Sequence, residues 1–312
     1  MMFLVMLACG SPQTLLDSLD PAAEPLLQHA PEGSTVLLGL DLVALADSAP
    51  GRRWMARHEG DLLTLDARFQ ERFGVAPTDL ERAALSCDEV GCSWLFEGDL
   101  SGLLLDSVGG QLAHESVPVR DVRLLPGHDA LLFRAEDGTP LRLQRLDDRR
   151  LAVGHGPAVK QRGSGVSGLE GAIPRGQAWL VLRHPEQLRE QVQTYLSWRG
   201  TPEALQTAEK VDRAWGLRPE LLDRVEVVAL SVAADERLAV RVSCWDVQSA
   251  DEVFGFVEPL LQAQRVEASL DPGLREALGH LELVRQGRRI ELRTDQGFGA
   301  LEFLISLAEN LP

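Results

Sequence analysis

The chain has 312 residues, of which 45% are hydrophobic and 25% charged, and its formal net charge is −16. At about 150 residues per domain, this length predicts two domains, and no run of about 18 apolar residues is present that would span a bilayer. A net negative charge repels phosphate backbones, which argues against a nucleic-acid partner.

The first ten residues form an apolar run that ends in a small residue and a cysteine. Leu7, Ala8 and Cys9 come last in this run, and Gly10 follows. The segment resembles the end of a bacterial lipoprotein signal peptide, in which cleavage before the cysteine leaves that residue to carry acyl chains. It departs from the family pattern because Met6 stands where leucine is usual and no basic residue precedes the run.

The lipoprotein resemblance implies a location and a membrane partner. Residues 1–9 are then the signal and the lipidated Cys9, and residues 10–30, rich in Ser, Pro, Ala and Asp, are a tether. The protein is expected in the bacterial cell envelope, anchored by its N-terminal lipid and facing the periplasm or the exterior.

An internal repeat governs the interpretation of the rest of the chain. The pattern Pro-x-Gly followed by a hydrophobic strand occurs at 31–38 and again at 174–181. A second pair of blocks, 73–77 and 215–219, has an aromatic residue, a glycine and a proline in the same order and at nearly the same offset. Two separated blocks at nearly one offset indicate a duplication.

The first copy is predicted over 31–160. A helix with an apolar stripe at Met55, His58, Leu62, Leu65 and Phe69 precedes a hairpin of strands 83–87 and 92–96. A short helix near 100–108 and strands at 130–135, 141–146 and 151–153 complete the copy. Residues 161–173 are then a linker.

The second copy is predicted over 174–312. Strands are expected at 178–182, 225–232 and 237–244, with helices between the first two and a hairpin at 281–292 before a final helix. Ser249 and Glu252 form a capping box that opens another helix. The order β-α-β-β-α-β predicts an α+β protein of two tandem ferredoxin-like repeats, each an antiparallel sheet with helices on one face. The body resembles uncharacterised duplicated envelope lipoproteins, a likeness that implies no activity.

Two cysteines flank a four-residue loop. Cys87 and Cys92 end and begin the predicted hairpin strands, so a disulfide across the hairpin is expected in an oxidising compartment. A metal site or two free thiols are the alternatives, although Cys-x4-Cys lacks the second pair of ligands that zinc needs.

No motif predicts catalysis or a cofactor. Residues 163–168 fit Gly-x-Gly-x-x-Gly, but the residues that follow cannot open the helix that a dinucleotide site requires. His114, Glu115 and Ser116 have the residue types of a hydrolase triad, yet sequence neighbours rarely converge in space. We therefore expect no cofactor, no metal and no catalytic residue.

Trp245 follows the second strand of the second central hairpin and is predicted to point away from the Cys244 face. An exposed aromatic side chain there would be a candidate partner surface, whereas packing between the copies is the structural alternative.

Three functions fit these observations. The first is a non-enzymatic, lipid-anchored binding or scaffold module, with another envelope protein as its candidate partner. The second is a periplasmic carrier of a small apolar ligand in the cleft between the copies. The third is an exported hydrolase whose carboxylates converge only in the fold.

Overall fold

The computed structural model describes most of the chain from Ser34 to Thr294. The described residues are 34–88, 91–114, 119–127, 129–136, 138–155, 176–185, 219–233, 237–266 and 279–294. Cys9, the tether at 10–30, the linker at 161–173 and the glycine motif at 163–168 lie outside them.

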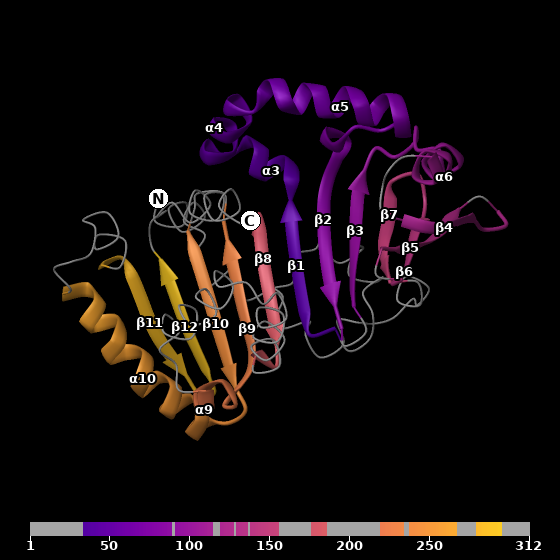
Figure 1. Ribbon diagram of the computed structural model, residues 1–312. Helices are drawn as coiled ribbons and strands as arrows, with labels where there is room; N and C mark the ends of the chain where they lie inside the picture. The colour runs from indigo at the N-terminus through magenta and orange to yellow at the C-terminus, as the bar shows by residue number, and fades with distance from the viewer. Residues whose placement is uncertain are drawn as a thin grey trace, which may run out of the picture.

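The described residues form a single twelve-stranded sheet (Figure 1), in which every pair of hydrogen-bonded neighbours is antiparallel. The strands lie in the order β11-β12-β10-β9-β8-β1-β2-β3-β7-β6-β5-β4. Their bounds are β1 Val36–Asp41, β2 Leu80–Cys87, β3 Cys92–Gly98, β4 Val119–Leu124, β5 Ala130–Ala135, β6 Pro140–Arg145, β7 Arg150–His155, β8 Ala178–Arg183, β9 Val225–Val232, β10 Leu238–Cys244, β11 Leu281–Gln286 and β12 Arg289–Thr294.

Helices connect some of these strands. Helices α3, α4 and α5 and a short 3-10 turn lie between β1 and β2, and α6 lies between β3 and β4. Helix α9 precedes β9, and α10 joins β10 to β11. Their bounds are α3 Leu42–Asp47, α4 Ala49–Arg57, α5 Glu59–Phe73, the 3-10 turn Pro77–Asp79, α6 Leu105–His114, α9 Pro219–Leu222 and α10 Val247–Val266.

The prediction of two ferredoxin-like repeats is wrong. In that fold each unit builds its own sheet, whereas here β1 and β8, the first strands of the two predicted copies, pair with each other from Val36↔Leu182 to Leu40↔Ala178. An exposed strand edge presents unpaired N–H and C=O groups, and the β1–β8 pairing satisfies these groups on both strands. The result is a single continuous sheet.

The connection between β1 and β2 also differs from a βαβ crossover. Helices α3 to α5 lie near one end of strands β1 to β3 (Figure 1), and β2 returns antiparallel to β1. Read outward from the β1–β8 pair, the strand order is β1, β2, β3, β7, β6, β5, β4 on one side and β8, β9, β10, β12, β11 on the other. The duplication of the sequence stays a prediction.

Local hydrogen bonds and one glycine determine where the helices between β1 and β2 begin and end. The Asp41 carboxylate accepts a hydrogen bond from the Ala44 N–H at 2.8 Å and caps α3. The Ser48 hydroxyl accepts one from the Gly51 N–H at 3.0 Å and caps α4. Helix α5 ends at Gly74, whose φ of 77° lies in the left-handed region that favours glycine.

The predicted helix is two helices, because α4 ends at Arg57 and α5 begins at Glu59, with His58 between them as the cap of both. The helix expected near 100–108 begins later, at Leu105, and strand β4 was not predicted. The strand expected at 225–232 is present with the same bounds.

The two faces of the sheet differ in their share of small residues. Side chains alternate between the faces along each strand, so the register assigns them. One face, here called the small-residue face, carries many buried glycine, alanine and serine residues, in the main at Gly39, Ala84, Ser86, Ser93, Ala152, Gly154, Ala229, Ser231 and Ala239. Between them it also buries the large side chains of Leu37, Leu95, Trp179 and Val181.

The opposite face, here called the helix-bearing face, carries larger apolar side chains. Helices cover it at both ends of the sheet. Near β5 to β7, Leu105 and Val108 of α6 pack with Leu131 and Leu143. Near β10 and β12, Ala250 and Val253 of α10 pack against Cys244 and Ile290, so each end of this face has a core of its own.

Candidate functional site: the apolar hollow

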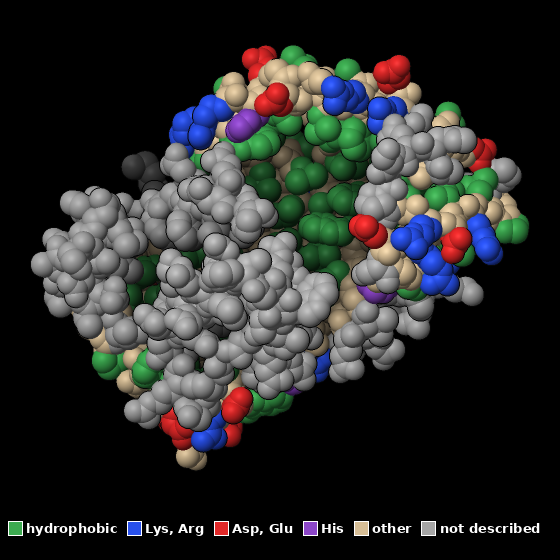
Figure 2. Space-filling view, viewed as in Figure 1, with side chains coloured by type: hydrophobic (Ala, Val, Ile, Leu, Met, Phe, Trp, Pro, Cys, Tyr) green, Lys and Arg blue, Asp and Glu red, His purple; other side chains and the backbone are tan. Residues whose placement is uncertain are grey.

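The middle of the helix-bearing face is a candidate binding surface. We call it the apolar hollow and define it by nine half-buried side chains on five neighbouring strands, namely Val36, Leu38, Leu40, Leu85, Trp94, Phe96, Leu180, Leu182 and Leu230. Figure 2 shows a recess lined by hydrophobic side chains at the centre of the molecule.

Register places these side chains on one surface. Leu38 of β1 lies directly opposite Leu85 of β2 and Leu180 of β8. Leu85 in turn lies opposite Trp94 of β3, and Leu180 opposite Leu230 of β9. Directly opposed residues of an antiparallel pair point to the same face, so a continuous apolar row crosses all five strands.

The hollow is uncharged. None of the registered positions on this face of β3, β2, β1, β8 and β9 is Asp, Glu, Lys, Arg or His. The nine side chains are half-buried, and a continuous apolar surface that is partly exposed often marks an interaction site.

An aromatic pair forms part of the surface. The rings of Trp94 and Phe96, two residues apart on β3, lie 5.9 Å apart with only 10° between their planes. Aromatic side chains contribute much contact area for little conformational entropy, so this pair is well suited to contact an apolar ligand.

Helix α5 lies beside the hollow, and only its last residue reaches a core of the described structure. None of its side chains is fully buried, and Leu65 and Phe69 are 41% and 38% exposed. Phe73, on the same helical stripe, packs against the core that contains Leu100 and Leu105. Hydrophobic side chains lie beneath α5 at the rim of the recess (Figure 2), so this helix offers further apolar surface there.

Groups with displaced pKa values lie away from the hollow. In the described chain they belong to turns, helix ends and the outer strands, at Asp99, Asp147, Arg149, Cys244, Asp246 and Arg293. Hydrogen bonds from the Ser101 hydroxyl and backbone N–H, for example, lower the pKa of the Asp99 carboxyl. These are features of folded turns, and they do not converge on a cavity.

A second pocket lies between α10 and β11 and contains Glu258, His280 and Glu282. These are residue types that the predicted hydrolase would use. The Glu282 carboxylate, however, is 61% exposed and accepts a hydrogen bond from Arg293 Nε at 2.8 Å. No group of three His, Cys, Asp or Glu side chains in the described residues could hold a metal.

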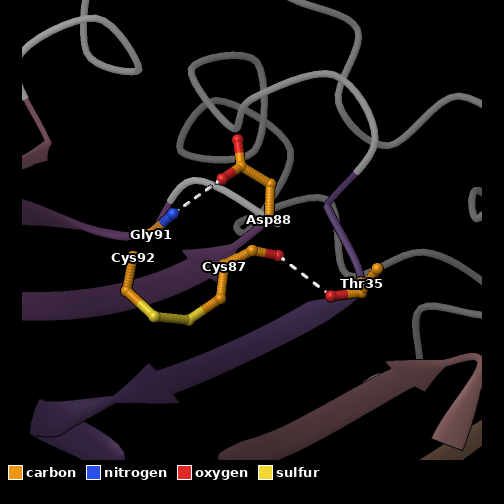
Figure 3. The surroundings of a disulfide bond; sticks show 5 residues. All are labelled: Thr35, Cys87, Asp88, Gly91 and Cys92. Atoms are coloured by element: carbon orange, nitrogen blue, oxygen red, sulfur yellow. Dashed lines mark hydrogen bonds between the residues drawn. A yellow bond between two sulfur atoms is a disulfide. The ribbon is translucent and has the colours of Figure 1, made fainter. Parts of the chain in front are cut away.

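The structure contains the disulfide between Cys87 and Cys92 (Figure 3). The two residues lie directly opposite each other on β2 and β3, at the edge of the hollow next to Val36. The third described cysteine, Cys244, is a buried free thiol whose pKa burial raises to about 11, with a further contribution from the Asp246 carboxylate.

Trp245 is 47% exposed and lies outside the hollow, beyond the end of β10. Its ring stacks on His184 with 5.5 Å between centroids. Val247, 52% exposed, is the exposed apolar residue nearest to it in sequence. This surface is much smaller than the hollow.

The hollow was not predicted from sequence as a site. A partial signal was present, because Gly39 lies between Leu38 and Leu40 in β1, and Leu85 lies between Ala84 and Ser86 in β2. That alternation predicts which residues share a face, but it does not show which part of the face helices cover.

Comparison with known proteins identifies a distant likeness only. No protein-family model matches the chain, and no curated protein sequence matches it. Among solved structures, crystal form III of TP0453 matches with a TM-score of 0.45 at 10% identity, covering 93% of this chain and 99% of that one. Crystal form IV of TP0453 matches with a TM-score of 0.43 at 10% identity, covering 93% and 97%.

No helix among the described residues is both long and apolar enough to cross a membrane.

Proposed function

We propose that this protein is a non-enzymatic binding module of the bacterial envelope that holds an apolar ligand, such as an acyl chain, in the apolar hollow. The observation that carries the proposal is the row of half-buried large side chains across β3, β2, β1, β8 and β9, on a face whose two ends are covered by helices. This proposal corresponds to the carrier function expected from the sequence. It differs in having the ligand on the face of one continuous sheet rather than in a cleft between two copies.

The dimensions of the hollow suit a hydrocarbon chain. Five neighbouring strands span about 19 Å and three side-chain rows along a strand span about 13 Å, at the usual strand spacing and rise. Each methylene group that leaves water contributes about 0.8 kcal/mol, so a chain several carbons long would gain enough to offset the entropy lost on binding.

A scaffold function through Trp245 has weaker support. The indole ring already stacks on His184, and a specific protein interface buries about 800 Å² on each partner. Trp245 and Val247 alone would supply a small part of that area.

A lipid anchor at Cys9 remains part of the proposal. It would hold the hollow near a membrane, where acyl chains are abundant. Its support is the residue pattern at 1–10, which resembles a lipoprotein signal.

Titration with the fluorescent fatty acid cis-parinaric acid tests the binding function. We expect saturable binding to the full-length protein and a loss of at least about tenfold in affinity for Leu85→Arg, because the new charge lies in the middle of the apolar row. Leu104→Arg is the matched control, since Leu104 is 60% exposed next to the start of α6. Circular dichroism establishes that both variants fold.

Two results would count against the proposal. One is the absence of saturable binding to the unmodified protein, and the other is equal affinity for the Leu85→Arg and Leu104→Arg variants.

A further inference from the structure

The disulfide between Cys87 and Cys92 lies at an accessible position. Cys87 is the last residue of β2 and Cys92 the first of β3, and the side chain of Cys92 is exposed whereas that of Cys87 is half-buried. A reagent in solution therefore reaches the bond from the Cys92 side. A disulfide that serves only to stabilise a fold is more often shielded.

The turn between the cysteines is held by its own hydrogen bonds. The Asp88 N–H donates to the Gly91 carbonyl oxygen, and the Gly91 N–H donates to Asp88 Oδ1, each at 3.0 Å. The Thr35 N–H donates to the Cys87 carbonyl oxygen at 2.8 Å. The β2–β3 ladder continues on the far side of the bond as far as Leu80↔Gly98.

The disulfide thus adds little stability to a hairpin that its own hydrogen bonds already hold together. It closes a loop of only a few residues, and the entropy that a disulfide removes from the unfolded chain is smallest for short loops. The hairpin is expected to persist when the bond is reduced.

An imidazole lies against this turn. The β3–β7 register pairs Ser93 with Gly154, so His155, the next residue of β7, comes beside Cys92. The ring contacts Gly91 closely, since a Cβ at Gly91 would lie 2.1 Å from His155 Cδ2 and 2.2 Å from Nε2. A neighbouring imidazolium stabilises a thiolate and lowers the thiol pKa.

Among the described residues of this turn, the Asp88 carboxylate opposes this effect. The Asp88 carboxylate belongs to the same turn, and a carboxylate disfavours a nearby thiolate. Figure 3 shows that it lies on the side of the turn away from the two sulfur atoms, where it accepts the hydrogen bond from the Gly91 N–H. Of these two described side chains, His155 is therefore the better placed to act on Cys92.

We propose that Cys87 and Cys92 form a thiol–disulfide exchange site, with Cys92 as the exchanging sulfur and His155 as the residue that stabilises its thiolate. An external thiolate attacks Cys92 Sγ, a new S–S bond forms there, and the bond to Cys87 breaks. Cys87 leaves with the electron pair and takes a proton from water.

A second external thiolate then attacks the external sulfur of this mixed disulfide and releases Cys92 as a thiolate beside His155. Two external thiols are oxidised to one disulfide, and the cysteine pair is reduced by two electrons. Reaction of the reduced pair with an external disulfide reverses both steps, so the exchange needs only thiols and disulfides as co-reactants.

The test uses the full-length protein with Cys9→Ser, so that the N-terminal thiol does not react. The folded protein is first incubated with reduced dithiothreitol and then alkylated with iodoacetamide at a series of pH values, and mass spectrometry locates the modification. We expect reduction without denaturant and selective alkylation of Cys92 with a pKa below the value of about 8.5 of a free thiol. His155→Phe is expected to slow alkylation of Cys92 at pH 7 about tenfold, which corresponds to about one pKa unit.

His184→Phe is the matched control, because His184 stacks on Trp245 beyond the end of β8, which β1 separates from the β2–β3 hairpin. A native protein whose disulfide resists dithiothreitol would overturn the proposal. Equal alkylation rates of Cys92 in the His155→Phe and His184→Phe variants would equally overturn it. Neither result bears on fatty-acid binding, which the Leu85→Arg comparison tests separately.

Discussion

The ring of Trp179 occupies the space that a side chain at position 39 would fill, because Gly39 has none. The two residues lie directly opposite each other across the β1–β8 pair, and a Cβ at Gly39 would lie 2.2 Å from Trp179 Cε2 and 2.3 Å from Cζ2. Trp179 is 2% exposed, so the indole ring has little room to move away. This contact lies at the junction between the two halves of the sheet.

Gly39→Ala is therefore expected to lower the free energy of unfolding by about 1–3 kcal/mol, the usual cost of overpacking a core. Urea denaturation measures the change. The double variant Gly39→Ala, Trp179→Leu should recover part of the loss, because the smaller side chain removes the conflict. Gly60→Ala is the control, since nothing lies within 4 Å of a Cβ there. An equal effect of Gly39→Ala and Gly60→Ala would contradict this account.

A buried ion pair on the small-residue face gives a second prediction. Arg241 and Glu291 lie opposite each other on β10 and β12, with side chains 4% and 6% exposed and 3.0 Å between Nη2 and Oε1. Removing one partner leaves a buried charge without its counter-ion, so Arg241→Met should cost about 3–5 kcal/mol in urea denaturation.

The double variant Arg241→Met, Glu291→Leu is expected to recover most of this loss, because no unpaired charge remains. The control is Arg288→Met, which breaks the exposed pair between Arg288 and Glu226 and should cost less than about 1 kcal/mol. If both arginine variants lost the same stability, burial would not be the cause.

Strand boundaries were more predictable from sequence than strand neighbours. The strands predicted at 225–232 and 237–244 correspond to β9 and β10, and their observed pairing runs from Leu238↔Val232 to Cys244↔Val225. The pairing of β1 with β8 brings together residues far apart in the chain, and a periodicity of two contains no information about such a partner. For this reason the predicted pair of separate sheets was wrong.

The same difference between local and long-range features holds for the disulfide and the apolar hollow. The disulfide could be expected because its two cysteines flank one short turn, so local structure alone sets their separation. The apolar hollow is built from strands of both halves of the sheet. How much of it stays uncovered depends on how far α6 and α10 extend over this face. The start of α10 also differed from expectation, since the Asp246 carboxylate accepts from the Ser249 N–H and the helix begins at Val247.

Cys244 gives a prediction about pH. Burial, with a contribution from the Asp246 carboxylate, raises the pKa of its thiol from 9.0 to about 11. The folded state thus favours the neutral thiol. The stability linked to this group is fully present below about pH 9 and is lost as the pH rises through about 11, since only the unfolded chain ionises readily in between.

In the Cys9→Ser protein, Cys244 should fail to react with Ellman's reagent at about pH 8 and should react at once in urea. Cys244→Ala should flatten the fall in stability between about pH 9 and 11. Rapid labelling of Cys244 in the folded protein would contradict its placement in the core that contains Val253 and Ile290.

The anchor at Cys9 makes the last prediction. A lipid-modified cysteine would hold the protein in the membrane fraction of the cell that produces it, because several acyl chains together bind a bilayer firmly. Cys9→Ala should move the protein to the soluble fraction and abolish its partition into the detergent phase of Triton X-114. Cys244→Ala is the matched control, since it removes a buried thiol and leaves the N-terminus unchanged. If Cys9→Ala and Cys244→Ala fractionate alike, acylation of Cys9 does not hold the protein at a membrane, and the hollow would have to obtain its ligand from solution.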